Sequence, residues 1–441
     1  MSRLGSITAR QWNTLSAGTL SFFFDSWDAF LLIYVLTDIA TEFRITVAKA
    51  SLALLFTYLS RWLGGLVLGS VAARWGRKKA LALGILIFGV FTVLTGYASS
   101  FEMLLFFRLC FGIGMGGVYA AAGPLVVESV GPRVRGFASG LFMFGFYLGN
   151  VLAPWTYYLM EPHFGWRGMF WFGGVSLLLI PYVLLTVPES PAWKARADVL
   201  RKGAAKGVRA LPTWKLFAPA YIGITMALLL VEFGEFFDSY PFQSILPTYL
   251  KVERHFPIHM VALAGSAIGV GALIGSLCGG LLSDRIGRKR TFAIGFILAI
   301  VPTSVSLLTH QAWLVVVASF VNGMIFGSLA GIVTAFENEH FPTDLRAAGN
   351  GVLHNLGALG GSIGAVLAAT LRHVAGYGTT IIIIASSGAV LGLLGLYFTR
   401  ETHDLSLHEL DETEDANEAP ALGVASSAHA KHGSPPALNA D

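Results

Sequence analysis

The amino-acid sequence predicts an all-α membrane protein of twelve transmembrane helices, arranged as two pseudo-symmetric six-helix bundles. The first observation is composition: 54% of the 441 residues are hydrophobic, only 13% are charged and the mean hydropathy is +0.66. The hydrophobic fraction and the mean hydropathy are higher, and the charged fraction is lower, than in a water-soluble globular domain. The second observation is an internal repeat, because segment 69–79 returns as segment 280–290 with its glycines and basic residues in the same places. Two copies of one unit are therefore fused.

The predicted spans are apolar stretches long enough to cross about 30 Å of hydrocarbon. Six fall in each half of the chain. They are residues 17–39, 51–73, 80–99, 102–127, 137–160, 167–187, 217–250, 261–283, 290–309, 312–336, 347–371 and 377–399.

The distribution of charge predicts the orientation. The sequence has 30 Lys and Arg residues, and most fall in segments on the side of the two termini. The positive-inside rule places that side in the cytoplasm. We therefore expect a multi-pass protein of the cell membrane, a bacterial inner membrane, whose first span is retained. Basic clusters such as segment 285–290 are short loops between spans, so no nucleic-acid partner is expected.

The span pattern divides the chain into four parts. Residues 1–187 form an N-terminal six-helix bundle, and residues 217–400 form a C-terminal one. Segment 188–216, with seven basic residues, is the expected cytoplasmic linker. Segment 401–441 is acidic and then rich in Ala, Ser, Pro and His, which predicts a disordered cytoplasmic tail.

Spans two, five, eight and eleven carry glycines at one-turn spacing. Glycine lets helix backbones approach closely in lipid. Two readings stay open: ordinary static packing, or an interface along which the two halves rock.

These motifs together resemble the major facilitator superfamily over residues 15–400. The loop after span two matches the family signature Gly-x-x-x-Asp-Arg-x-Gly-Arg-Lys; the copy at 280–290 is complete, and the first copy has Ala73 in place of the acid. The resemblance implies the family fold and alternating access without an enzyme activity. It also implies a gating role for both copies and for the charges that follow them: Arg74, Gly76, Arg77, Glu128, Arg135, Asp284, Arg285, Gly287, Arg288, Glu339 and Arg346.

Several shorter stretches are similar to the sialate and lactate proton-symporter groups. They are segments 60–65, 108–119, 165–167, 188–191, 345–349 and 354–361. This similarity implies proton-coupled symport of a small organic carboxylate, such as a monocarboxylate, into the cell by a monomer.

Charged residues inside spans are costly, by about 2.5 to 3.5 kcal/mol each on insertion scales, and therefore indicate function. Asp25 and Asp28 lie three residues apart on one helical face of span one, and Glu235 and Asp238 repeat this spacing on span seven. Two carboxylates this close in a low dielectric cannot easily both ionise, so each pair is suited to carry an exchangeable proton. We expect both pairs to face the central cavity.

Two arginines inside spans are candidates for partners of these acids or of a substrate. The resemblance makes Arg108 the partner of a span-one acid, released when that acid is protonated. Arg61 has no acid within one turn, and its guanidinium suits a carboxylate. It either anchors an organic anion or neutralises Asp25, Asp28 or Glu235. A permanent structural salt bridge between Asp28 and Arg108 is the alternative.

Other polar residues lie at depths where family members contact substrate. They are Tyr119, Tyr147, Asn150, Gln243, Asn322, His354 and Asn355. For Glu232 and His354, a role in helix packing is the open alternative.

No cofactor is expected beyond the coupling proton. The sequence contains no Gly-x-x-x-x-Gly-Lys-Ser/Thr loop, so ATP is not the expected energy source. His255 and His259 have chelating spacing without a third ligand nearby, so no metal site is expected. The alternatives are sugar or polyol symport, suggested by segment 188–191, proton-coupled export, and a nutrient receptor built on the same fold.

Overall fold

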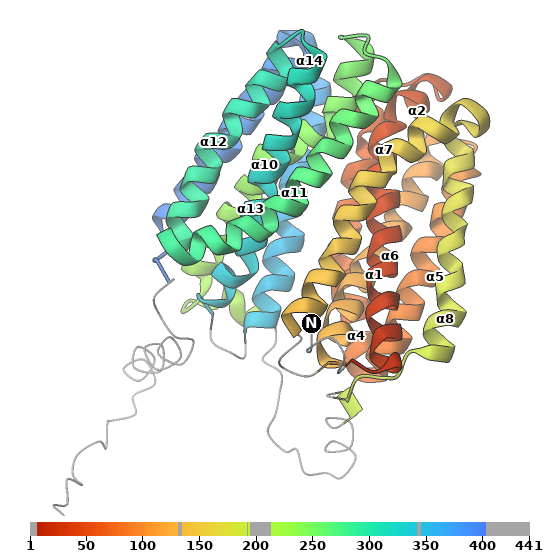
Figure 1. The fold of residues 1–441 in the computed structure, drawn as a ribbon, viewed down its shortest axis with the longest axis vertical. Helices are drawn as coiled ribbons and strands as arrows, with labels where there is room; N and C mark the ends of the chain where they lie inside the picture. Colours follow the sequence, from red (N-terminus) through yellow and green to blue (C-terminus); the bar gives the residue numbers. More distant parts are fainter. Residues whose placement is uncertain (1–6, 131–134, 192, 195–212, 342–344, 403–441) are drawn as a thin grey trace, which may run out of the picture.

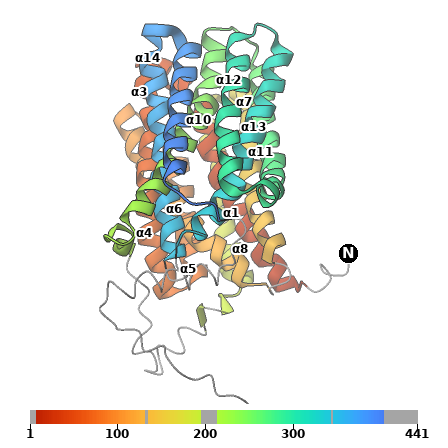
Figure 2. The ribbon, with the colours of Figure 1, turned by 90° about the vertical axis from the view of Figure 1, so that its left-hand side faces the viewer.

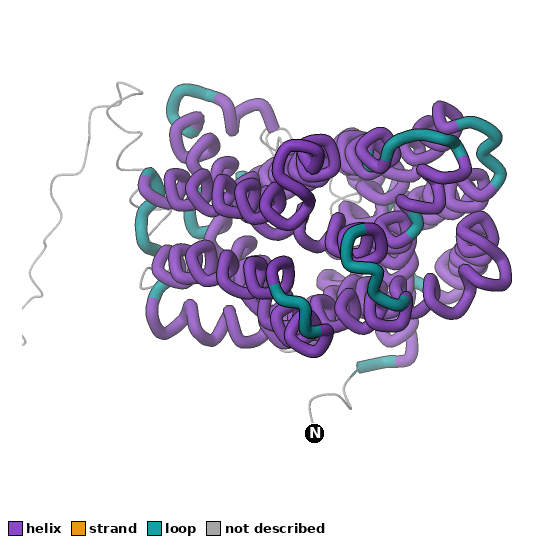
Figure 3. The backbone as a smooth tube through the Cα atoms, turned by 90° about the horizontal axis from the view of Figure 1, so that it is seen from above, coloured by secondary structure: helices purple, strands orange, loops and turns teal. Residues whose placement is uncertain are grey.

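The structure is a computed structural model, and it describes residues 7–130, 135–191, 193–194, 213–341 and 345–402. Every described element is a helix, and the helices form two bundles that pack side by side (Figures 1 and 3). The predicted tail from residue 403 and most of the predicted linker lie outside the described residues. All-helical architecture follows from the environment, because a helix satisfies its own backbone hydrogen bonds without water.

The N-terminal bundle begins with a capped helix: the Thr8 side chain accepts from the Gln11 N–H, and the Gln11 side chain accepts from the Thr8 N–H. A 56° bend separates α1 from α2. The elements are α1 (Ala9–Tyr34), α2 (Leu36–Glu42), α3 (Val47–Ala50), α4 (Leu52–Trp75), α5 (Arg77–Gly96), α6 (Phe101–Glu128), α7 (Arg135–Gly173), η3 (Gly174–Leu178) and α8 (Leu179–Thr186).

The C-terminal bundle repeats this order after a short 3-10 turn (Figure 2). Its elements are η4 (Thr213–Phe217), α10 (Ile222–Val252), α11 (Ile258–Ile286), α12 (Arg288–Leu308), α13 (Ala312–Asn338) and α14 (Arg346–Tyr397).

Eight described helices are long and apolar enough to cross a membrane, or nine if the bent pair α1 and α2 counts as one span. Two of the eight each contain two spans, because α7 is kinked at Gly165 (φ 60°) and α14 at Gly376 (φ 73°). The acid-bearing α10 is not among the eight. With the bent pair, the two kinks and α10 all counted, the described residues hold the twelve predicted spans.

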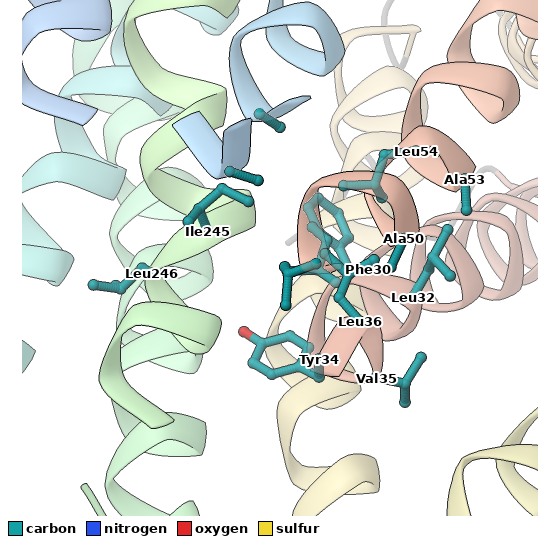
Figure 4. Close-up of a cluster of buried hydrophobic side chains, with 14 of the residues drawn as sticks. Phe30, Leu32, Tyr34, Val35, Leu36, Ala50, Ala53, Leu54, Ile245 and Leu246 are labelled. Carbon is teal, nitrogen blue, oxygen red and sulfur yellow. The ribbon is translucent and has the colours of Figure 1, made fainter. Parts of the chain in front are cut away.

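The two turns between α4 and α5 and between α11 and α12 lie at one end of the bundles, called here the linker end; the α1–α2 bend lies at the opposite, far end (Figure 1). At the far end one hydrophobic core contains residues of both bundles. Figure 4 shows Tyr34 of α1 beside Ile245 and Leu246 of α10. The other two core clusters lie mainly in one bundle each. The shared core therefore joins the bundles toward the far end.

The glycine stripes lie at two kinds of close helix contact, between the bundles and within them. Gly265 and Gly269 on α11 let Tyr34 and Val151 of the N-terminal bundle approach closely, so they lie between the bundles. Most of the other stripe glycines, such as Gly64 against Ile113, pack helices within one bundle.

Candidate transport site

Asp28 and Arg108 form an ion pair in the interior of the N-terminal bundle. Arg108 Nη1 lies 2.6 Å from Asp28 Oδ1, and the two side chains are 0% and 1% exposed. Arg108 Nε and Nη2 both donate to Thr95 Oγ1, at 3.2 and 2.9 Å. Asp28 Oδ2 has no hydrogen-bond partner. The carboxylate therefore depends on Arg108 for the compensation of its charge.

Aromatic rings close the remaining faces of this pair. The Arg108 guanidinium carbon lies 4.4 Å from the Phe111 ring centroid and 4.9 Å from that of Phe170. All of these contacts come from α1, α5, α6 and α7. The pair is thus enclosed by its own bundle, which differs from the expectation of a pair facing a central cavity.

Arg61 on α4 is the second buried guanidinium, 5% exposed. Among the side chains that the structure describes, no carboxylate lies within 4.0 Å of it. Its Nε has no hydrogen-bond partner, and the same is true of both carboxylate oxygens of the buried Asp25. Arg61 therefore keeps free donors in a place where water is scarce.

Tyrosines surround Arg61 and connect it to the other bundle. Its guanidinium carbon lies 6.0 Å from the Tyr58 ring centroid and 5.9 Å from that of Tyr119. The Tyr58 hydroxyl hydrogen-bonds to the Tyr240 hydroxyl of α10. The Tyr119 ring stacks on His354 of α14 at 6.1 Å. Side chains of α4, α6, α10 and α14 thus meet at Arg61.

Among the predicted polar residues, Tyr119 and His354 come together at Arg61, and the described contacts of the others are with different groups. Tyr147 hydrogen-bonds to Ser276 across the bundles, and Asn150 packs on Gly269. Asn355 Nδ2 donates to Gly351 O at 2.7 Å. Gln243, 5% exposed, has an unpartnered Nε2.

The span-seven acids lie in the C-terminal bundle. Glu235 and Asp238 line a narrow hollow together with Asn322 of α13. All residues that line it come from α10, α12 and α13, so this hollow lies within one bundle. We expected this pair to face a cavity between the bundles, and the structure instead places it at a hollow inside the C-terminal bundle.

Several of the predicted gating residues form matching contacts at the linker end of each bundle. Arg77 Nη2 lies 3.7 Å from Glu128 Oε1, and Arg288 Nη2 lies 3.4 Å from Glu339 Oε1. Arg288 Nη1 also lies 2.6 Å from Asp284 Oδ1. Gly76 and Gly287 take φ values of 108° and 100°. These contacts stay within each bundle.

The remaining four predicted gating arginines comprise two exposed residues and two whose side chains the structure does not describe. The exposed Arg74 and Arg285 make no ion pair with any described side chain. Arg135 and Arg346 begin α7 and α14, and their side chains lie outside the described part of the structure.

The N-terminal copy lacks the signature acid, and another group occupies that region. Trp193 Nε1 donates to the Ala73 carbonyl oxygen at 2.8 Å. In the N-terminal copy this indole hydrogen bond to the backbone lies where the C-terminal copy has the Asp284–Arg288 ion pair.

Both halves of the chain, each with a copy of the loop motif, match one family model. The description of that model is Major Facilitator Superfamily, and it matches residues 18–232 and 228–430. The chain belongs to the Major Facilitator Superfamily. It is therefore a multi-pass membrane transporter and not an enzyme, as the sequence motifs predict.

Known relatives of this superfamily member match about three quarters or more of its length. It is 30% identical over 411 residues to the sialic acid transporter NanX of Escherichia coli, covering 90% of this chain and 96% of the relative. It is 31% identical over 330 residues to the 3-(3-hydroxy-phenyl)propionate transporter of Escherichia coli, covering 74% and 78%. It is 24% identical to the cis,cis-muconate transport protein of Acinetobacter baylyi, covering 87% and 92%.

Solved structures of the superfamily show the same fold. The inward open conformation of the xylose transporter XylE from Escherichia coli has a TM-score of 0.72 at 18% identity, covering 91% of this chain and 99% of that one. A bacterial homologue of the lysosomal transporter Spinster, inward-facing and unoccupied, has a TM-score of 0.64 at 18% identity, covering 89% and 95%.

Sequence reasoning missed several residues that the structure places at these sites. Thr95 holds the Arg108 guanidinium, and Glu337 of α13 lies buried beside Glu232. Lys251 of α10 binds the N-terminal bundle at the far end. Glu337 and Lys251 are charges near the ends of spans, where the sequence alone does not separate a buried group from an exposed one.

Proposed function

We propose that this transporter carries a small organic carboxylate into the cell together with a proton, by alternating access. In this proposal the linker end and both termini lie in the cytoplasm, the membrane is a bacterial inner membrane, and a monomer of two bundles, 1–187 and 217–400, performs the cycle. The tail, 401–441, remains in the cytoplasm.

One observation carries the proposal: Arg61 is a buried guanidinium with no acid at ion-pair distance among the described side chains. A buried cation without a counter-ion is unfavourable, and an organic anion supplies the missing charge. The planar guanidinium offers two parallel N–H donors, which match a carboxylate. Its neighbours come from both bundles, so an anion bound there contacts both.

The Asp28–Arg108 pair supplies the proton step. Protonation of Asp28 removes its charge and frees Arg108, and deprotonation restores the ion pair. Asp25 lies one helical turn from Asp28, and both of its carboxylate oxygens are without a partner, so it is a second carboxyl that can take up the coupling proton. Enclosure of the pair keeps the proton out of water while the bundles reorient.

The substrates named for the relatives support a carboxylate. Sialic acid, muconate and 3-(3-hydroxy-phenyl)propionate all carry a carboxyl group, although their sizes differ. A monoanion moved with one proton makes the cycle electroneutral, so the pH gradient, and not the voltage, drives it.

The test is uptake into proteoliposomes of labelled sialic acid, muconate, 3-(3-hydroxyphenyl)propionate and lactate. We expect at least one acid to accumulate when a pH step is imposed and to ignore an imposed potential. Arg61→Ala abolishes this uptake, whereas the control Arg372→Ala, which removes a half-buried arginine that contacts Tyr377 near the Gly376 kink, does not. Voltage-driven uptake, or full uptake by Arg61→Ala, contradicts the proposal.

A further inference from the structure

The C-terminal bundle buries a second group of carboxyls that the proposed cycle does not use. Glu232 and Glu235 of α10 and Glu337 of α13 are 1%, 2% and 2% exposed. No described Lys or Arg side chain lies at ion-pair distance from them. Burial of several ionised carboxylates together is costly, and a proton on one of them lowers that cost.

Glu232 and Glu337 contact each other directly. The two carboxyl groups, one on α10 and one on α13, are near enough for one to donate to the other, and Oε1 of each has no hydrogen-bond partner. An ionised carboxylate can only accept a hydrogen bond, so a carboxyl–carboxyl hydrogen bond requires a proton on one partner. Gly357 of α14 makes room for this pair, since a Cβ there would lie 2.6 Å from Glu232 Cβ.

His354 connects the pair to the Arg61 site. Its Nδ1 lies 3.5 Å from Glu232 Oε1, and its side chain is 30% exposed. The same ring stacks on Tyr119, whose face lies 5.9 Å from the Arg61 guanidinium carbon. An imidazole in this place accepts a proton from one side and passes it on from the other.

A separate buried group also lacks a donor here. Asn322 is 1% exposed, and its Nδ2 donates to Thr303 Oγ1 at 2.9 Å, which fixes the amide orientation. Its Oδ1 has no partner and lines the hollow that Glu235 and Asp238 share. An amide oxygen aimed at carboxyls is satisfied when one of them is protonated.

We propose that the Glu232–Glu337 pair holds an exchangeable proton and forms a second proton site, connected through His354 to the Arg61 site. The charged and titratable groups around the pair are Glu235 and Asp238 on α10, His354 on α14, Tyr119 on α6 and Arg61 on α4. The coupling role of this site rests on the proposed function, whereas the presence of the proton does not.

The experiment is infrared difference spectroscopy of the full-length protein in lipid, stepped between acidic and alkaline buffer without any substrate. A protonated carboxylic acid has a carbonyl stretch that a carboxylate lacks. We expect the wild type to show this band at acidic pH and lose it at alkaline pH. Other buried carboxyls contribute to the same region, so Glu337→Gln and Glu232→Gln each remove one component of the wild-type band, and Glu337→Asp, which keeps a titratable group, shifts that component.

Glu339→Gln is the matched control, because Glu339 lies two residues from Glu337 but pairs with Arg288 at the linker end. It leaves the band unchanged. A band of unchanged shape and intensity in both Gln variants, or a wild type without a pH-dependent band, overturns the proposal. If Glu337→Gln does not fold, Glu232→Gln decides alone. A band without carboxylate uptake by the wild type refutes the transported anion and leaves the proton site standing.

Discussion

Glu189 and Glu401 occupy equivalent places in the two halves and cap equivalent helices. Glu189 Oε1 accepts from the Arg77 N–H at 2.9 Å, and Glu401 Oε1 accepts from the Arg288 N–H at 2.7 Å. Each carboxylate thus binds the positive end of a helix dipole, at α5 and α12. The neighbouring Ser190 and Thr402 hydroxyls hydrogen-bond to Glu128 and Glu339. The internal repeat therefore includes the segment after each sixth span.

Replacing Gly76 by Ala is expected to destabilise the N-terminal bundle. Gly76 has φ 108°, and a Cβ there would overlap the Glu189 carboxylate. The strained backbone alone costs about 1–3 kcal/mol, so the thermal unfolding midpoint in detergent falls. Gly140→Ala is the control, because nothing lies within 4 Å of a Cβ at Gly140. Equal midpoints for the two variants would contradict this explanation.

Breaking the Asp28–Arg108 pair is expected to reduce both stability and proton-driven uptake. Asp28→Asn leaves a buried guanidinium without its counter-ion, which costs about 3–5 kcal/mol. The double variant Asp28→Leu with Arg108→Met removes both charges, so it recovers stability without recovering transport. Thermal unfolding and proteoliposome uptake measure the two effects. Normal proton-driven uptake by the double variant would show that the pair is only structural.

Lys251→Met is expected to open the far end more often. Lys251 Nζ donates to Tyr34 O and Thr37 Oγ1, both at 2.7 Å, and to Tyr157 OH at 3.2 Å, so it ties α10 to the N-terminal bundle. The measurement is the rate at which a thiol reagent labels Ser266→Cys, a buried site between the bundles.

This labelling uses a background in which Cys110 and Cys278 are replaced by Ser. We expect a severalfold faster rate with Lys251→Met. Lys49→Met is the control, since Lys49 lies over Phe101 within one bundle. Unchanged labelling with Lys251→Met would show that the shared apolar core alone keeps the far end closed.

His340 is expected to make the protein sensitive to acid. Burial at the linker end, beyond α13, lowers the pKa of His340 from 6.5 to about 4. Between these values the unfolded chain binds the proton and the folded one does not, so stability falls as pH drops from about 6.5 toward 4. The loss reaches at most about 3 kcal/mol.

His340→Gln removes this titration, so its unfolding midpoint should change less between neutral pH and about pH 5. The His340 ring contacts the Phe336 carbonyl oxygen through Nδ1 at 2.7 Å, and Gln can supply a similar donor. The same acid sensitivity in the variant and the wild type would assign the effect to other groups.

The sequence by itself determined the membrane environment, the repeat and the superfamily. Spans are readable because hydrocarbon requires long apolar helices, and the loop signature is readable because its glycines and charges are contiguous. The sequence also identified Asp28 and Arg108 as charged residues inside apolar spans, and the structure places them in one ion pair. Such inferences depend on residues that are local in sequence or costly wherever they lie.

Only the tertiary structure decided which buried groups meet. Arg61, Tyr119 and His354 come from three different helices. Glu232 and Glu337, which lie close together, come from two more helices, α10 and α13. The same holds for Asp28, which faces the interior of its own bundle and not a space between bundles. The rotation of each helix about its axis sets these contacts, and close packing of small residues against distant backbones sets that rotation. A single sequence does not encode that packing in any local pattern.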